Sequence, residues 1–389
     1  MDQTGMERQE MKALRIDRRG FALALTTALL AGCAVVPKGP SAPPPPAGPD
    51  ETTLPSDDGR HRIALLVPTT GTNGNVGQSI ANATTMALLD TNAGNLRITT
   101  YDTATGAESA AAKAIADGNR LILGPLLGED TANVVKVARR KGVPLISFSN
   151  DASTASRDVF LLGHIPAQSV QRTVDYAYAQ GARRFAALVP QGDYGRQAET
   201  SLSSAVLGKG ASLMSVEKYD RGSSGIVEAA KRLDGKGGFD TVLIADGARL
   251  SALAGAQFAR KPQILGTELW SGEASVGAST ALRGALFSAV SDSRYKQFAN
   301  SYKTRFGTQP YRISTLGYDA VLLTLKVARD WKPGATFPTA KLLDKGGFLG
   351  VDGPFRFLPS GVGERAMEVR KVGNGTVTVV SPAPTRFAE

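Results

Sequence analysis

From residue 61 onward, short runs of apolar residues alternate with segments in which apolar residues recur at every third or fourth position. The first apolar run covers residues 62–68. A Gly/Thr/Asn loop leads from it to residues 78–90, whose apolar residues share one helical face. Short continuous apolar runs are typical of strands buried on both faces of a parallel sheet. The alternation therefore predicts β-α units in which helices cover both faces of a sheet.

The same alternation continues along the chain and restarts near residue 169. It predicts further strands at 96–101, 121–125, 143–148, 185–190, 212–219, 241–245 and 263–266, and a strand-rich tail from 350 to 380. It predicts further helices at 108–117, 130–141, 169–180, 196–208, 226–233, 248–259, 293–306 and 315–329. We therefore expect an α/β fold of two doubly wound lobes, with a cleft between them beyond the carboxyl ends of the strands.

The order of the elements also predicts how the lobes divide the chain. Lobe 1 is expected to comprise residues 61–163 with 285–330. Lobe 2 is expected to comprise residues 164–284 with 331–380, and 381–389 form a short tail. The chain should then pass between the lobes several times.

Residues 1–32 have the pattern of an export signal. An arginine-containing region precedes the uncharged stretch 20–32, which is too short to span a bilayer and is typical of a signal-peptide core. The stretch ends in Leu30-Ala31-Gly32-Cys33, which resembles the lipobox of bacterial lipoproteins, and Cys33 is the single cysteine of the chain. The resemblance implies lipid attachment at Cys33. The paired arginines leave both general secretion and twin-arginine export open.

A proline-rich segment follows the signal. Residues 34–60 contain eight prolines and little apolar bulk. Such a segment cannot bury enough surface to fold, and its prolines favour the extended polyproline II conformation. We therefore expect residues 33–60 to consist of the lipidated Cys and a disordered tether.

Composition narrows the chemistry that the chain can perform. One Cys and two His exclude a disulfide framework and a Cys/His zinc site. His61 and His164 have no nearby Ser or carboxylate in a catalytic arrangement, and we expect surface or hinge positions for them. The motifs of serine hydrolases, phosphate loops and zinc proteases do not occur. We predict that the protein is not an enzyme and uses neither a metal nor a cofactor.

The net charge of +10 permits an acidic partner. The export signal and the aromatic content of 6% argue against nucleic acid. The basic surplus fits the acidic cell envelope better.

Seven short motifs then carry a resemblance that spans residues 61–372. In order and spacing they resemble the type 1 periplasmic-binding-protein family, in its branched-chain amino-acid receptor group. The motifs are Pro68-Thr69-Thr70-Gly71, Tyr101-Asp102, Gly124-Pro125, Gly142-Val143-Pro144, Asp193-Tyr194-Gly195, Tyr318-Asp319-Ala320 and Gly350-Val351-Asp352-Gly353-Pro354-Phe355. The resemblance implies a binding protein with a ligand in the cleft between its lobes.

The loop after Gly124-Pro125 departs from this family. Amino-acid receptors of the family place a small hydroxyl residue there for the ligand carboxylate. Here the loop reads Leu126-Leu127-Gly128-Glu129-Asp130, and we expect Glu129 and Asp130 to repel a carboxylate. We therefore predict no tight binding of free α-amino acids.

The resemblance supplies the other candidates for the cleft, each of which also fits an ordinary turn or helix cap. An acidic group for a ligand ammonium could be Asp246 or Glu268. The full set of candidates is Thr69, Thr70, Ser149, Asn150, Asp151, Tyr194, Asp246 and Glu268.

The segments 146–151, 159–163 and 187–190 resemble penicillin-binding protein activators, which are lipoproteins that stimulate a peptidoglycan synthase from the outer membrane. We therefore predict a lipid-anchored regulator of such a synthase on the periplasmic face of the envelope, with the outer membrane favoured because Ala34, and not Asp, follows Cys33. Known activators carry a helical-repeat domain where this chain has its tether. This difference favours the alternative, a solute-binding lipoprotein of an ABC importer for amino acids, amides or similar small solutes.

Overall fold

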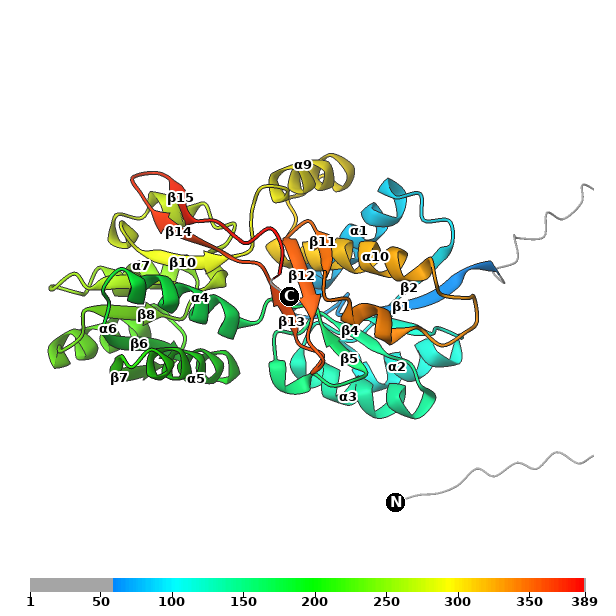
Figure 1. Cartoon of the computed structure of the whole chain (residues 1–389), viewed down its shortest axis with the longest axis horizontal. Coiled ribbons are helices and arrows are strands. Elements are labelled where there is room, and N and C mark those ends of the chain that lie inside the picture. The colour runs from blue at the N-terminus through cyan, green and yellow to red at the C-terminus, as the bar shows by residue number, and fades with distance from the viewer. Residues whose placement is uncertain (1–58, 388–389) are drawn as a thin grey trace, which may run out of the picture. The chain divides into compact units, whose positions relative to one another are not determined.

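The computed structural model of the protein describes residues 59–387. Within this range the chain forms an α/β fold of two lobes, as the apolar pattern predicted (Figure 1). The predicted signal peptide, Cys33 and nearly all of the predicted tether lie outside the described residues. Between residues 59 and 387, the structure has no helix that is long and apolar enough to cross a membrane.

Lobe 1 is built on a five-stranded parallel sheet with the order β2-β1-β3-β4-β5. Ile63 and Leu65 of β1 share one core with helices α1 and α10, and the alternate residues Ala64 and Leu66 share another core with α2 and α3. Both faces of the sheet are therefore covered. The elements are β1 (His61–Val67), β2 (Leu96–Asp102), β3 (Leu121–Leu123), β4 (Leu145–Ser147), β5 (Val159–Leu161), α1 (Gly74–Asp90), α2 (Ala107–Ala116), α3 (Gly128–Ala138), α9 (Tyr295–Phe306) and α10 (Thr315–Ala328).

Lobe 2 is built on a seven-stranded sheet with the order β15-β14-β10-β9-β8-β6-β7. Its strands are parallel except for β14 and β15, which pair in the antiparallel sense at one edge. Helices α4 and α5 share a core with one face, and α6 and α7 with the other. The elements are α4 (Pro166–Ala179), β6 (Arg184–Pro190), α5 (Asp193–Gly208), β7 (Ser212–Tyr219), α6 (Ser223–Lys236), β8 (Thr241–Ile244), α7 (Ala248–Gly255), β9 (Gln263–Leu265), α8 (Ser275–Ala278), β10 (Leu286–Ala289), β14 (Glu368–Val372) and β15 (Val377–Ser381).

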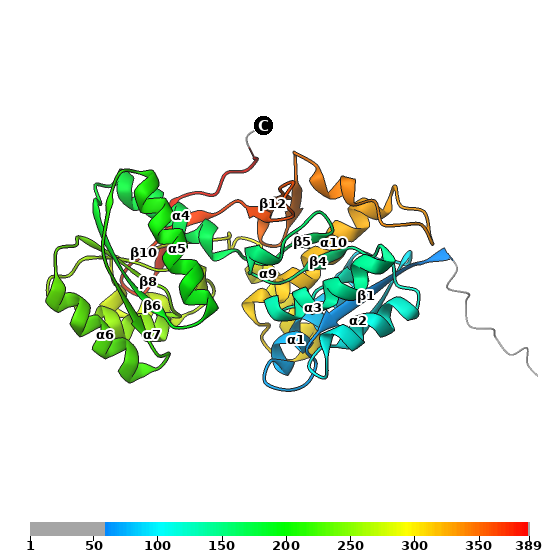
Figure 2. The same ribbon diagram turned by 90° about the horizontal axis from the view of Figure 1, so that it is seen from below.

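Three connections join the lobes, at residues 162–165, 290–294 and 366–367 (Figures 1 and 2). Before the third connection, the chain forms a small antiparallel sheet of β11 (Phe348–Gly350), β12 (Gly353–Phe357) and β13 (Gly363–Arg365). This sheet belongs with lobe 1, because Phe348, Phe355 and Phe357 lie in the core of that lobe. Arg365 in β13 donates to the carbonyl oxygen of Leu162, and Arg370 in β14 donates to that of Val290, so the three connections lie close together.

The predicted division of the chain differs from this arrangement in its second half. Residues 285–330 were expected in lobe 1, but β10 lies inside the sheet of lobe 2. Residues 331–380 were expected in lobe 2, but Trp331, Phe337 and Phe348 pack in the core of lobe 1. Strands of three to five residues carry no local signal that selects one of two similar sheets.

In each lobe, the helix that follows the first strand lies against the end of that strand at a glycine. A Cβ at Gly195 in α5 would lie 1.7 Å from the carbonyl oxygen of Pro190, and one at Gly77 in α1 would lie 1.8 Å from that of Pro68. We expect Gly195→Ala to lower the free energy of unfolding by about 2 kcal/mol or more, because helix α5 and the end of β6 must move apart to make room for the added methyl group. Gly208, at the other end of α5, has open space around it, and Gly208→Ala should cause no loss. Urea denaturation measures both; equal effects would contradict the prediction.

Candidate ligand-binding site

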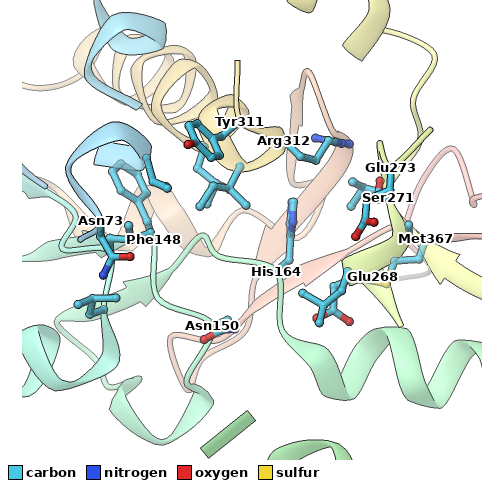
Figure 3. Close-up of a pocket in the computed structure, with 18 residues that line it drawn as sticks. Asn73, Phe148, Asn150, His164, Glu268, Ser271, Glu273, Tyr311, Arg312 and Met367 are labelled. Atoms are coloured by element: carbon cyan, nitrogen blue, oxygen red, sulfur yellow. The ribbon is translucent and has the colours of Figure 1, made fainter. Parts of the chain in front are cut away.

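A cavity of about 520 Å³ lies between the two lobes, where the carboxyl ends of β3, β4, β9 and β10 meet. Figure 3 shows Asn73, Phe148 and Asn150 on one side of it, Glu268, Ser271, Glu273 and Met367 on the other, and His164 between them. This is the position at which open α/β sheets bind ligands. The lining residues are Asn73, Val76, Leu126, Leu127, Phe148, Asn150, His164, Glu268, Leu269, Ser271, Glu273, Ala289, Val290, Tyr311, Arg312, Ile313, Leu316 and Met367.

The walls of the cavity are mainly apolar. Lobe 1 contributes Leu126, Leu127 and Phe148 from the loops after β3 and β4, and lobe 2 contributes Leu269 and Val290 after β9 and β10. Burial of apolar ligand surface against such walls supplies most of the binding free energy in sites of this size. The few polar groups then decide which ligand fits.

Asp352 organises the polar groups at the base of the cavity. Its side chain is 0% exposed, and it accepts hydrogen bonds from Arg312 Nη1 at 2.7 Å and Thr315 Oγ1 at 2.8 Å. Arg365 Nη1 lies 3.9 Å from the same carboxylate. Burial opposes ionisation of Asp352, but the guanidinium of Arg312, together with His164 and Arg365, more than compensates, so that the pKa of the carboxyl lies well below its usual range.

Arg312 also reaches a second carboxylate. Its Nη2 lies 3.4 Å from Asp292 Oδ1, and its guanidinium carbon lies 4.3 Å from the ring centre of Tyr295. Asp292 in turn pairs with Arg370, whose Nε donates to Glu368 Oε1 at 2.7 Å. The ion pairs therefore run continuously from lobe 1 into β14 of lobe 2. We call the residues Arg312, Arg365, Arg370, Asp292, Asp352 and Glu368 the hinge cluster.

His164 stands in the first connection and lines the cavity. Its side chain is 12% exposed, and its Nε2 lies 2.9 Å from Asp352 Oδ2. Burial lowers the pKa of His164 and outweighs the Asp352 carboxylate, which acts in the opposite direction. The imidazole is therefore neutral at neutral pH.

Glu268 faces the cavity from lobe 2 and is 9% exposed. The hydroxyl of Tyr194 donates to Glu268 Oε1 at 3.0 Å, and Oε2 is buried without a hydrogen-bond partner. Burial raises the pKa of Glu268 to about 7, because no cation offsets the loss of water. Burial also raises the pKa of Tyr194 well above its ordinary value, and the nearby Glu268 raises it further.

The sequence candidates occupy different places. Asn150 and Glu268 line the cavity, and Tyr194 contacts Glu268. The backbone N–H of Thr69 and the hydroxyl of Thr70 both donate to Asp102, and neither threonine lines the cavity.

The remaining candidates lie behind the cavity wall. Ser149 is buried and its Oγ accepts from the backbone N–H of Asp151, while the Asp151 carboxylate caps the short helix at 152–154. Asp246 accepts from the hydroxyl of Tyr219 at 2.8 Å and from Arg221 Nε at 3.2 Å. The hydroxyl of Ser149 and the carboxylates of Asp151 and Asp246 therefore all form hydrogen bonds within the protein.

Glu129 and Asp130, which we expected to repel a ligand carboxylate, do not line the cavity. Leu126 and Leu127 of the same loop line it instead. The loop therefore presents apolar side chains to a ligand where two carboxylates were predicted.

Sequence reasoning missed Arg312 and Asp352 as site residues and assigned no ligand role to His164. His164 and Asp352 are 188 residues apart, and Arg312 and Asp352 are 40 apart. The one available signal was the place of His164 near the first connection.

Two α/β lobes that supply facing walls to one cavity at the ends of their strands define the class of two-lobed binding proteins. The chain belongs to the periplasmic binding protein family, which it matches over residues 61–376. This is a family of binding proteins rather than enzymes, and it places the folded body in the periplasm.

The chain is also similar to individual proteins of other bacteria. An uncharacterized protein of Rickettsia prowazekii (strain Madrid E) is 28% identical over 173 residues, a match that spans 44% of this chain and about half (46%) of the relative. A leucine binding protein from Thermotoga maritima MSB8 has a TM-score of 0.65 at 20% identity, with 82% of this chain and 98% of that chain covered.

Two ligand complexes have the same fold. A solute binding protein of an ABC transporter from Rhodopseudomonas palustris BisB5, in complex with 3,4-dihydroxy benzoic acid, has a TM-score of 0.66 at 18% identity, with 86% and 97% coverage of the two chains. A branched-chain amino acid transporter substrate binding protein from Streptococcus pneumoniae, in complex with isoleucine, has a TM-score of 0.66 at 18% identity, with 84% and 100% coverage. At these identities the likeness shows the fold alone.

Proposed function

We propose that this protein is a solute receptor that binds a small molecule between its lobes and delivers it to a membrane importer. The observation that carries the proposal is the cavity of about 520 Å³, whose apolar walls come from both lobes. Because each lobe supplies part of the wall, a ligand in the cavity holds the lobes together. A solute receptor needs this property so that its importer can distinguish the loaded form from the empty form.

The solute receptor, which was the alternative function in the sequence analysis, is the function that we propose. Regulation of a peptidoglycan synthase is the second hypothesis. The segments 146–151, 159–163 and 187–190 motivate that hypothesis by their resemblance to activator lipoproteins. Pull-down of the mature protein from envelope extract separates the two functions: importer permeases are expected for a receptor, and a synthase for a regulator. Anchoring through Cys33 and attachment to the outer membrane stay predictions from the sequence.

Ligand binding can be tested by native mass spectrometry of the purified protein and by thermal shift against a library of small solutes. At a hundredfold excess over its Kd, a ligand should stabilise the folded state by about 2.7 kcal/mol. Asn150→Trp fills the cavity from an exposed position and should abolish this gain. Ala132→Trp, on the exposed side of α3, should keep it. A library with no stabilising compound, together with no co-purified molecule, would contradict the receptor function.

A further inference from the structure

The base of the cleft is a cluster of charges that compensate one another. Arg312 and Arg365 face Asp352, Arg370 faces Asp292 and Glu368, and Arg312 also reaches Asp292. Three guanidinium groups therefore meet three carboxylates within the hinge cluster. Although Arg312 lines the cavity, its positive charge is already matched before a ligand arrives.

His164 adds a neutral group to this base. A neutral imidazole beside an ionised carboxylate carries its proton on the nitrogen that faces the carboxylate. Nε2, at 2.9 Å from Asp352 Oδ2, is therefore the donor. Nδ1 is then an acceptor, and it has no hydrogen bond to any residue between 59 and 387. His164 lines the cavity and lies between its two walls in Figure 3, and we infer that this acceptor can receive a hydrogen bond from a ligand N–H group.

The opposing wall carries two carboxyl groups, Glu268 and Glu273, and no cation among those of its residues that line the cavity. Glu273 Oε1 accepts from the backbone N–H of Ala248 at 3.3 Å, and its Oε2 accepts from Ser275 Oγ at 3.4 Å. Glu268 is nine-tenths buried, and its Oε2 has no partner within the described part of the chain. Ser271 lines the same wall, and its hydroxyl is likewise unpartnered. A buried carboxyl group with no cation beside it favours its protonated form, which both donates and accepts hydrogen bonds.

We propose that the cleft selects an uncharged solute, with an apolar body and one neutral group that both donates and accepts hydrogen bonds, of which a carboxamide is the simplest example. The proposal rests on the receptor function and names its ligand class. The neutral group would lie between His164 and Glu268, and the apolar body against Leu126, Leu127 and Phe148.

Charged ligands fit this cleft less well. A carboxylate would lose its water without gaining an uncompensated cation, because the carboxylates of the hinge cluster already neutralise Arg312 through Nη1 and Nη2. Only Nε of this guanidinium lacks a hydrogen-bond partner within the described part of the chain. An ammonium would lie in the same cavity as the Arg312 guanidinium, and Glu268 would have to ionise while buried to pair with it. The oxygens of Glu273, the other carboxylate of this wall, already accept hydrogen bonds from Ala248 and Ser275. A carboxamide needs neither an uncompensated cation nor an ionised Glu268.

Three compounds with one carbon skeleton test the proposal: hydrocinnamamide is neutral, hydrocinnamate is an anion and phenylpropylamine is a cation. Calorimetry or thermal shift slightly below neutral pH should give a Kd for the amide that is lower by about tenfold or more than for either charged compound. Tighter binding of the acid or the amine, or failure of all three to bind, would overturn the proposal.

A change in the hinge cluster tests the cause of this selectivity. Asp292 is 29% exposed and does not line the cavity, so Asp292→Asn should fold. It removes one carboxylate from beside Arg312, and hydrocinnamate should then gain affinity relative to the amide by about threefold or more. Asp292→Glu should restore the original preference. Asp158→Asn breaks a comparable pair with Arg139 on the surface of lobe 1 and should change nothing.

The outcomes separate this inference from the receptor function. A purely structural role of Asp292 would weaken the binding of all three compounds alike, and that result would overturn the proposed charge compensation. If the solute library yields a charged ligand, the receptor function stands and the neutral-ligand proposal falls. If no compound of the library binds and no molecule co-purifies, the receptor function itself falls.

Discussion

Replacing Asp352 by Asn should lower the free energy of unfolding by about 3–5 kcal/mol, the largest loss that we expect from a single substitution in this protein. The carboxylate is fully buried and bonds to Arg312 and His164, with Arg365 close by. Asparagine preserves the shape but removes the charge, and it leaves two guanidinium groups with less compensation inside the protein. Breaking one side of a buried ion pair is costly for this reason.

Chemical denaturation of the described domain measures this loss. Asp330→Asn is the matched control, because Asp330 pairs with Lys341 on the surface, where both side chains are more than half exposed. An exposed pair contributes little, and the control should show no measurable change. A loss for Asp352→Asn that is no larger than the control would mean that the hinge cluster does not hold the lobes in this arrangement.

The second large effect is a pH dependence that originates at Glu268. Burial raises the pKa of this carboxyl to about 7 in the folded protein, against an ordinary value of 4.5. Between these two values the folded state keeps a proton that the unfolded state has released. The contribution of Glu268 to stability is therefore complete below the ordinary pKa and is lost as the pH rises through the folded pKa. The loss amounts to about 3 kcal/mol at most.

Glu268→Gln should remove this contribution, since glutamine does not titrate. Between about pH 5 and about pH 8, the free energy of unfolding of the native protein should fall by more than that of the variant, and the variant should be the more stable of the two at the higher pH. Burial also raises the pKa of Asp319 to about 7, so both proteins should keep part of the slope. Urea denaturation at the two pH values tests this. Parallel slopes would contradict the raised pKa of Glu268 in the folded state.

Local patterns predicted most of the architecture. The continuous apolar run of β1 predicted a strand buried on both faces, and its alternate residues do pack into separate cores. The order of strands and helices predicted two doubly wound lobes, and the structure and the family both confirm this prediction. Such patterns can be recognised in the sequence because a strand or helix buries its faces at a spacing set by its own geometry.

The candidate site was only partly accessible to sequence reasoning. Glu268 and Asn150 were found because they follow strands whose carboxyl ends must meet at the cleft. Ser149, Asp151 and Asp246 follow strands as well, but the structure uses their side chains for internal hydrogen bonds. Whether a polar residue after a strand faces a ligand or its own loop depends on side-chain direction, which residue spacing alone does not determine.

The sequence by itself determined the α/β class, the two lobes and the place of the cleft, because each of these follows from periodicity within short segments. Only the tertiary structure decided which lobe receives β10 and residues 331–357, and which charges meet in the hinge cluster. In the sequence, Asp352 is one residue of the motif at 350–355 with no partner indicated, and it becomes the buried partner of His164 and Arg312 because three connections converge beside it. Whether two charges pair depends on their distance in space. For residues that are far apart along the chain, no local sequence pattern indicates that distance.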